Sequence, residues 1–225
     1  MLKTELQTIE IESALQPRAA VIWLHGLGAD GNDFVPIVDE LDLGGLPPIR
    51  FVFPHAPVRP VTINGGMAMR AWYDIFNLDF SRRREDEAGI RASSQALEGL
   101  MARENARGVA DGKIVLAGFS QGGAIALHTG LRHAGRLAGI MALSTYLPLA
   151  ATLADEAAML NQDVPIFMAH GAQDTMIPLP FAAASRDFLR AGGYAVDWRE
   201  YFMGHSVCPE QIRDISGWLQ QVLAE

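Results

Sequence analysis

The chain has 225 residues, 49% of them hydrophobic, which suits one domain with a sizeable buried core. Its 18 Lys and Arg residues against 26 Asp and Glu residues give a formal net charge of -8. An acidic chain without a basic stripe argues against nucleic acid or an anionic membrane surface as the main partner.

The amino-terminal segment and the cysteine content bear on the compartment. Residues 1–10 are polar and alternating, without the apolar centre of a signal peptide. No apolar run approaches the ~20 residues of a membrane helix, and the single cysteine, Cys208, excludes an intrachain disulfide. We therefore expect a cytoplasmic protein with no integral membrane association, folded as a single domain over residues 1–225.

Segments with strand-like and helix-like patterns alternate along the chain. The first strand-like segment, residues 5–12, alternates as a half-buried edge strand does. The other predicted strands are residues 19–24, 49–53, 113–119, 137–143, 164–169 and 195–201, and the predicted helices are residues 34–41, 85–106, 121–133, 181–191 and 210–223. This order predicts an α/β fold with a mostly parallel central sheet and helices on both faces. Residues 54–69 are too long for a plain connection and are predicted to form a functional loop.

The segment 118–122, Gly-Phe-Ser-Gln-Gly, lies where a predicted strand runs into a predicted helix. A tight strand-to-helix reversal strains its central residue, Ser120, and lifts the hydroxyl away from the backbone. Gly118 and Gly122 fit this turn because larger side chains would clash there. The alternative interpretation is a glycine-rich turn that contains a serine, but the flanking strand and helix favour a nucleophile.

A serine nucleophile needs a base that is held by a third group. Asp174 follows the predicted strand 164–169, and His205 follows the predicted strand 195–201. Ligands of open α/β sheets bind outside the carboxyl ends of the strands, so we expect both side chains near Ser120. The order Ser, Asp, His is also that of α/β-hydrolases. His170, which opens the Asp174 loop, is predicted to orient that loop.

Acyl transfer also needs N–H donors for the developing oxyanion. We expect one from the backbone of Gln121, directly after the nucleophile, and one from Leu27 in the glycine-rich loop after the strand 19–24. That loop also has the Gly-x-Gly-x-x-Gly spacing of a dinucleotide-binding turn. The next strand, residues 49–53, does not end in the acidic residue that such a site requires, so the cofactor interpretation is disfavoured.

With these residues in place, the chain resembles the phospholipase/carboxylesterase family of α/β-hydrolases, which includes bacterial carboxylesterases and acyl-protein thioesterases. The matching segments are LHGLGADGNDF at 24–34, FPHAP at 53–57, WYD at 72–74, GFSQGGA at 118–124, HGAQD at 170–174 and GH at 204–205. The segment 59–69 is most similar to small bacterial carboxylesterases. The resemblance implies a Ser120, Asp174 and His205 triad, oxyanion donors at Leu27 and Gln121, no metal or other cofactor, and a homodimer in some members. The short chain leaves little room for a large cap domain.

The residues beside these segments supply candidates for an acyl pocket. The candidates for substrate binding are Thr62, Ile63, Met67, Trp72, Met176, Ile177 and Val207. Ordinary packing is the alternative for each of them, and Trp72 is equally suited to anchoring the loop 54–69. Cys208 is more typical of a small buried residue than of a site residue.

These observations predict a serine hydrolase that acts on a small-molecule carboxylic ester of short to medium acyl chain through an acyl-enzyme. Acyl-protein thioesters or lysophospholipids are the alternative substrates. A third hypothesis is a non-catalytic receptor on a hydrolase fold, which the retention of all three triad residues disfavours.

Overall fold

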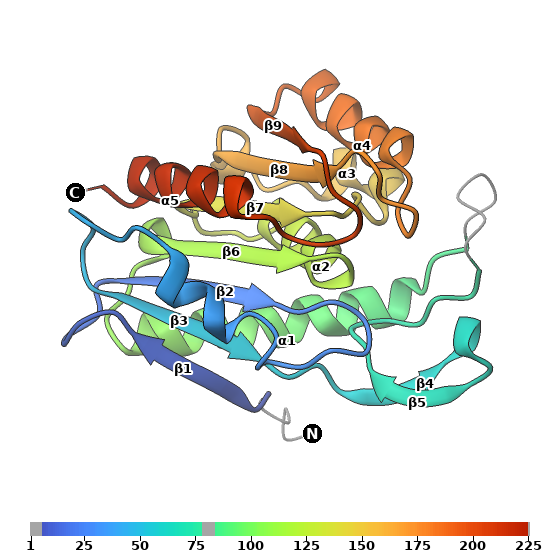
Figure 1. Cartoon of the computed structure of the whole chain (residues 1–225), viewed down its shortest axis with the longest axis horizontal. Coiled ribbons are helices and arrows are strands. Elements are labelled where there is room, and N and C mark those ends of the chain that lie inside the picture. The colour runs from blue at the N-terminus through green and yellow to red at the C-terminus, as the bar shows by residue number, and fades with distance from the viewer. Residues whose placement is uncertain (1–5, 78–83, 225) are drawn as a thin grey trace.

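The computed structural model describes residues 6–77 and 84–224, and a seven-stranded sheet forms its centre (Figure 1). Its order is β1-β3-β2-β6-β7-β8-β9. β1 pairs antiparallel with β3, and the other neighbours in this sheet pair in parallel. The bounds are β1 (Thr8–Glu12), β2 (Ala19–Leu24), β3 (Ile49–Pro54), β6 (Ile114–Phe119), β7 (Gly139–Leu143), β8 (Ile166–Gly171) and β9 (Val196–Tyr201). The predicted strands and the mostly parallel sheet are therefore confirmed.

Helices cover both faces of the sheet and create two apolar layers. The layer on one face contains residues of α1 (Glu87–Ala106), α2 (Gln121–Gly130), α3 (Leu153–Glu156) and α4 (Leu179–Ala191). The layer on the other face contains α5 (Pro209–Leu223) and the short 3₁₀ helix η1 (Val35–Glu40). Figure 1 shows α5 in front of the sheet and α1 behind it. The central strands carry continuous apolar runs because they are buried on both faces, as in β2 and β6.

Two predicted segments differ from the structure. Residues 34–41, predicted as a helix, contain the single 3₁₀ helix η1, whose buried residues Ile37 and Val38 are adjacent in sequence. A short 3₁₀ helix is enough to press such a pair against the sheet. Residues 54–69, predicted as a loop, contain most of an ordered hairpin made of β4 (Val58–Val61), the 3₁₀ turn η2 (Thr62–Asn64) and β5 (Met67–Arg70).

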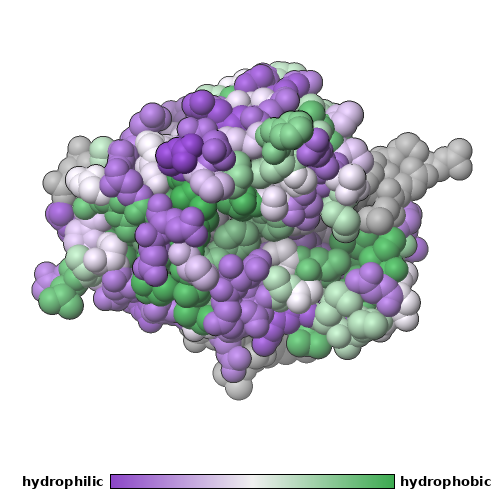
Figure 2. Space-filling view, viewed as in Figure 1, coloured by the Kyte–Doolittle hydropathy of each residue, from purple (hydrophilic) through white to green (hydrophobic). Residues whose placement is uncertain are grey.

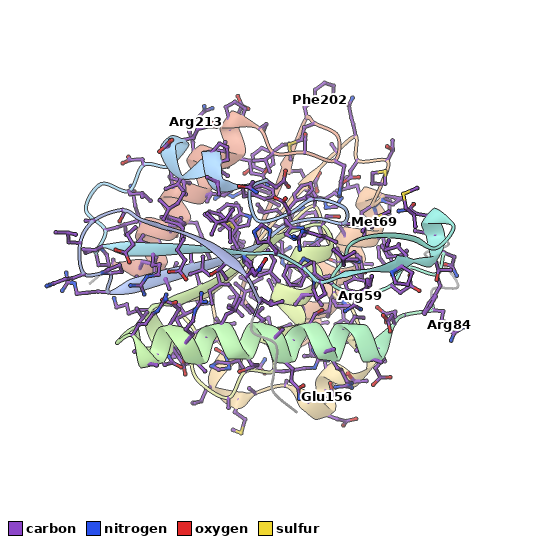
Figure 3. The ribbon with its side chains drawn as sticks, turned by 90° about the horizontal axis from the view of Figure 1, so that it is seen from below. Arg59, Met69, Arg84, Glu156, Phe202 and Arg213 are labelled. Carbon is purple, nitrogen blue, oxygen red and sulfur yellow. The ribbon has the colours of Figure 1, made fainter. Side chains whose placement is uncertain are left out.

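The hairpin stands out from the carboxyl end of the sheet (Figure 1). Gly65 and Gly66 turn the chain with φ angles of 67° and 78°, a left-handed conformation that glycine adopts without strain. Arg59, labelled in Figure 3, belongs to this hairpin. Its Nη1 lies 3.9 Å from Asp86 Oδ2, and Asp86 caps the start of α1. This ion pair ties the hairpin to the body of the protein. Apolar surface gathers over the hairpin in Figure 2.

The remaining short 3₁₀ helices are η3 (Asp111–Lys113), η4 (Ala150–Thr152) and η5 (Met159–Asn161), which lie in the connections between larger elements. No helix in residues 6–77 and 84–224 has the length and apolar character needed to cross a lipid bilayer.

Candidate active site

Ser120 occupies the turn between β6 and α2 with φ 54° and ψ -120°, a conformation that is costly for a residue with a Cβ. Hydrogen bonds hold the turn from both sides. Ser120 N–H donates to Leu143 O at 2.8 Å, and Thr145 Oγ1 donates to Ser120 O at 2.6 Å. The surrounding structure therefore maintains the strained geometry that presents the hydroxyl.

The two glycines of the pentapeptide are required by close backbone contacts. A Cβ on Gly118 would lie 2.5 Å from Gly123 N, and a Cβ on Gly122 would lie 2.6 Å from His25 O. Both distances are shorter than real Cβ contacts, and the atoms they approach belong to the backbone, which cannot move aside. The glycine frame predicted around Ser120 thus has a steric cause.

Asp174 and His205, which are 31 residues apart in sequence, meet beyond the ends of β8 and β9. His205 Nδ1 lies 2.7 Å from Asp174 Oδ2, and Asp174 Oδ1 accepts the N–H groups of Met176 and Ile177 at 2.9 Å each. Burial raises the pKa of Asp174, but the hydrogen bonds from His205 and Ile177 outweigh it and hold the pKa below its usual range. A carboxylate at this position accepts the Nδ1 proton and so leaves Nε2 of His205 as the basic nitrogen.

His170 supports the same loop from below. Its Nε2 lies 2.8 Å from Ile177 O and 3.3 Å from Asp174 Oδ2. Burial lowers the pKa of His170, so the ring is neutral and Nε2–H is a donor to these oxygens. This arrangement agrees with the prediction that His170 orients the Asp174 loop.

A cavity of about 470 Å³ opens at the carboxyl ends of the strands and is lined by Ser120 and His205 together. Its volume lies in the range of small-molecule sites. The apolar side chains in its lining are Leu27, Ala29, Ile63, Met69, Ile75, Phe119, Met176 and Ile177, and the other polar ones are Asp33, Asn64, Tyr73, Asn77, Gln121 and Tyr146. Phe119 also contacts the base, because its ring centroid lies 4.7 Å from that of His205. The lining is suited to an apolar chain that leads away from Ser120.

The loop that carries Leu27 is held by a buried histidine. His25 Nδ1 lies 2.7 Å from Gly26 O, and the N–H of Ala56 donates to His25 Nε2 at 3.0 Å. Burial lowers the pKa of His25 to about 4, so the ring is neutral, with its proton on Nδ1. Trp72 Nε1 donates to His25 O at 2.9 Å. These bonds keep the loop beside Ser120.

Gln121 is the other predicted oxyanion residue, and its backbone N–H opens α2, where the first N–H groups of a helix have no partner inside the helix. Both polar atoms of its side-chain amide are hydrogen-bonded to the backbone of another segment. Gln121 Oε1 accepts Trp72 N–H and Gln121 Nε2 donates to Tyr73 O, both at 2.7 Å. The side chain thereby fastens the segment 72–73 to the turn of the serine. Both Leu27 and Gln121 line the cavity.

The predicted acyl-pocket residues separate into two groups. Ile63, Met176 and Ile177 line the cavity, whereas Thr62, Met67, Trp72 and Val207 are not among its lining residues. Thr62 binds Asp74 through its N–H at 2.7 Å, Met67 is exposed, Trp72 is fully buried, and Val207 packs against the apolar layer under α5. Trp72 has the position expected of an anchor for the preceding segment. Cys208 is partly buried before α5 and is also outside the lining.

Sequence reasoning missed the two tyrosines of the cavity. Tyr73 lies inside the segment 72–74 that marked the family, so a signal existed. Substrate binding was predicted for its neighbour Trp72 instead. Tyr146 follows β7 by three residues and had no motif around it. The hydroxyl groups of Tyr73 and Tyr146 are hydrogen-bonded to each other.

The sheet order, the antiparallel first strand and the position of Ser120 after β6 define an α/β-hydrolase, and the described part of the chain adds no cap domain to it. Comparison with known proteins gives the family: the chain belongs to the phospholipase/carboxylesterase family, whose model matches residues 6–223. The family and the fold predicted from the sequence are both confirmed.

Particular relatives in this family are acyl-protein thioesterases. The chain is 41% identical over 213 residues to acyl-protein thioesterase 1 of Neurospora crassa, covering 91% of this chain and 87% of that one. It is 34% identical over 238 residues to acyl-protein thioesterase 1 of Cryptococcus neoformans, covering 99% and 100%. The crystal structure of Zea mays acyl-protein thioesterase 2 superposes with a TM-score of 0.86 at 29% identity, covering 96% and 99%.

Proposed function

We propose that this protein is a serine hydrolase that cleaves acyl thioesters, including those of acylated protein thiols, through an acyl-Ser120 intermediate. The observation that carries the proposal is the position of His205 on the same cavity as the strained Ser120, with a 2.7 Å hydrogen bond from His205 to Asp174. The names of the relatives favour the thioester alternative over the carboxylic esters that the sequence placed first.

The first half of the reaction forms the acyl-enzyme. His205 Nε2 accepts the proton of Ser120 Oγ, which attacks the thioester carbonyl and gives a tetrahedral oxyanion. The backbone N–H groups of Leu27 and Gln121 stabilise the negative charge. The C–S bond then breaks, and the thiol leaves with the proton that His205 had accepted.

The second half repeats these steps with water. His205 Nε2 accepts a proton from water, whose oxygen attacks the acyl-serine carbonyl and regenerates an oxyanion between the same two N–H groups. The C–O bond to Ser120 breaks, Ser120 recovers the proton from His205, and the carboxylic acid is released. Asp174 remains a carboxylate throughout, holds the ring with Nε2 toward the serine, and stabilises the imidazolium.

Carboxylic esters are the second candidate, because the cavity does not itself distinguish an oxygen from a sulfur leaving atom. Two peptides of one sequence separate the possibilities, one with S-octanoyl cysteine and the other with O-octanoyl serine. We expect the higher kcat/KM for the S-acyl peptide, measured by the release of octanoate. A higher kcat/KM for the O-acyl peptide would instead assign the protein as a carboxylic ester hydrolase.

The role of Ser120 is tested with a matched serine at the end of the neighbouring strand. Ser120→Ala is expected to lower kcat/KM on the S-octanoyl peptide by roughly 10⁴-fold or more, as is usual for a lost nucleophile. Ser144→Ala is the control, because Ser144 follows β7 directly and is fully buried outside the cavity lining. A fluorophosphonate probe is expected to label the wild type and Ser144→Ala but not Ser120→Ala. Full turnover by a folded Ser120→Ala variant would overturn the proposal, and failure of the wild type to label or turn over would favour a receptor.

A further inference from the structure

The cavity beside Ser120 has an exposed rim and a buried floor. Met176, at the rim, is 54% exposed, whereas Tyr73 and Tyr146 are 1% and 4% exposed. The floor therefore includes two tyrosines, which belong to the apolar layer beneath the cavity. Their hydroxyl groups are bonded to each other, although the walls around them are mostly apolar.

The two tyrosines come from segments far apart in sequence, and each segment is fastened to the serine turn. Gln121 Nε2 donates to Tyr73 O at 2.7 Å. Thr145, the neighbour of Tyr146, donates from Oγ1 to Ser120 O at 2.6 Å. The floor therefore has a fixed distance from the nucleophile, set by hydrogen bonds rather than by flexible packing.

The ring of Tyr146 is also immobilised from below. Its centroid lies 5.3 Å from that of Phe181 on α4, an ordinary spacing for packed aromatic rings. A chain that reached this floor could not turn the ring aside without disturbing α4. The hydroxyl–hydroxyl bond also joins the two rings.

We propose that the Tyr73–Tyr146 hydroxyl pair closes the acyl cavity and sets the longest acyl chain that the enzyme accepts. This inference rests on the proposed function, since it assumes an acyl group bound to Ser120. A chain shorter than the depth of the cavity buries each methylene against the apolar walls. A longer chain meets two polar oxygens that already bond each other, and its end must remain outside or separate them.

Replacing both hydroxyls deepens the cavity at its floor, where the two rings remain, without leaving a single hydroxyl in an apolar setting. Double replacement of hydrogen-bonded partners by apolar groups is often nearly neutral for stability, whereas loss of one partner is costly. Each hydroxyl has about the size of a methyl group, so Tyr73→Phe with Tyr146→Phe makes room for one or two more methylenes. Each methylene that enters the cavity is expected to raise kcat/KM about fourfold.

The experiment measures kcat/KM for S-acyl peptides of one sequence, with saturated acyl chains from acetyl to palmitoyl in single-carbon steps near the optimum. The proteins are the wild type, Tyr73→Phe, Tyr146→Phe, the double variant and Tyr194→Phe. Tyr194 is a matched control because it is also a buried tyrosine, but it is outside the lining of the cavity. Folding of each variant is checked by its urea midpoint.

The double variant is expected to move the optimum one or two carbons longer and to raise kcat/KM at the first lengths beyond the wild-type limit about 4- to 15-fold. Rates on chains shorter than the optimum are expected to change less than threefold. Tyr194→Phe is expected to keep the wild-type profile. An unchanged chain-length profile in the folded double variant would overturn the proposal that the tyrosine pair limits the acyl chain. The loss of activity in Ser120→Ala would still support the proposed function. Retained activity in Ser120→Ala would instead overturn the proposed function.

Discussion

The strain at Ser120 makes a prediction about stability that is independent of the substrate. Two variants lack the hydroxyl, Ser120→Ala and Ser120→Gly, and only the alanine retains a Cβ at φ 54° and ψ -120°. Strain of this kind costs about 1–3 kcal/mol. Glycine relieves it but loses about 0.4–1 kcal/mol through the greater freedom of the unfolded chain.

The net expectation is that Ser120→Gly has a free energy of unfolding about 0.5–2 kcal/mol above that of Ser120→Ala. For a chain of this size, the difference corresponds to roughly 1–8 °C in Tm. Urea unfolding with equal m-values measures it directly. The helix residue Ser94 supplies a control pair, for which the alanine variant is expected to exceed the glycine variant by about 1 kcal/mol. A Ser120→Gly variant that is no more stable than Ser120→Ala would refute the claim that the backbone at residue 120 is strained.

Three other predictions concern buried polar groups. Asp174→Asn keeps the size of the side chain but removes the charge that fixes the His205 tautomer, so kcat/KM is expected to fall about 10³- to 10⁴-fold. Gln121→Glu places an oxygen against Tyr73 O in a buried site, which is expected to lower the free energy of unfolding by about 2–5 kcal/mol. His128 is buried, and desolvation lowers its pKa from 6.5 to about 4. Its contribution to stability is therefore complete above pH 6.5 and is lost as the pH falls toward 4, because the unfolded chain takes up the proton first. His128→Leu is expected to reduce the slope of stability against pH in this window by up to about 1.4 kcal/mol per pH unit.

Gln121→Glu has a matched control variant, and the other two predictions have outcomes that would contradict them. Gln162→Glu affects an exposed glutamine that also donates to a backbone oxygen, Gly192 O at 2.8 Å, and is expected to cost less than about 1 kcal/mol. Equal losses in the two glutamate variants would contradict the argument from burial. A kcat/KM of Asp174→Asn within tenfold of the wild-type value would contradict the proposed role of the Asp174 carboxylate in the mechanism. For His128, urea unfolding at several pH values is the measurement, and an unchanged slope would contradict the lowered pKa.

The sequence located Ser120, Asp174 and His205 because each residue lies within five residues after the end of a predicted strand. Parallel strands bring their carboxyl ends to one edge of a sheet, so residues far apart in the chain were expected to meet there. The structure brings Asp174 and His205 into contact and places His205 on the same cavity as Ser120. Local patterns were sufficient because the parallel sheet itself determines where the strand ends lie.

The acyl cavity depended on contacts that no local pattern encodes. The hairpin that contributes Ile63 and Met69 was read as a loop, since its two strands have four residues each and little alternation. Thr62 and Met67 lie on that hairpin but outside the cavity lining. Thr62 is bonded to Asp74 through its N–H and its hydroxyl, and Met67 is exposed beside the turn.

The sequence by itself determined the fold class, the family and the order of the proposed catalytic residues, since strand periodicity and the glycine frame of Ser120 are properties of short segments. Only the tertiary structure decided the shape of the cavity and its floor. Tyr73 and Tyr146 are 73 residues apart, and their contact exists because Gln121 and Thr145 fasten both segments to the serine turn. Such a contact depends on the packing of segments far apart in sequence. The segment 72–74 marked the family but did not indicate the partner of Tyr73, and Tyr146 had no motif around it.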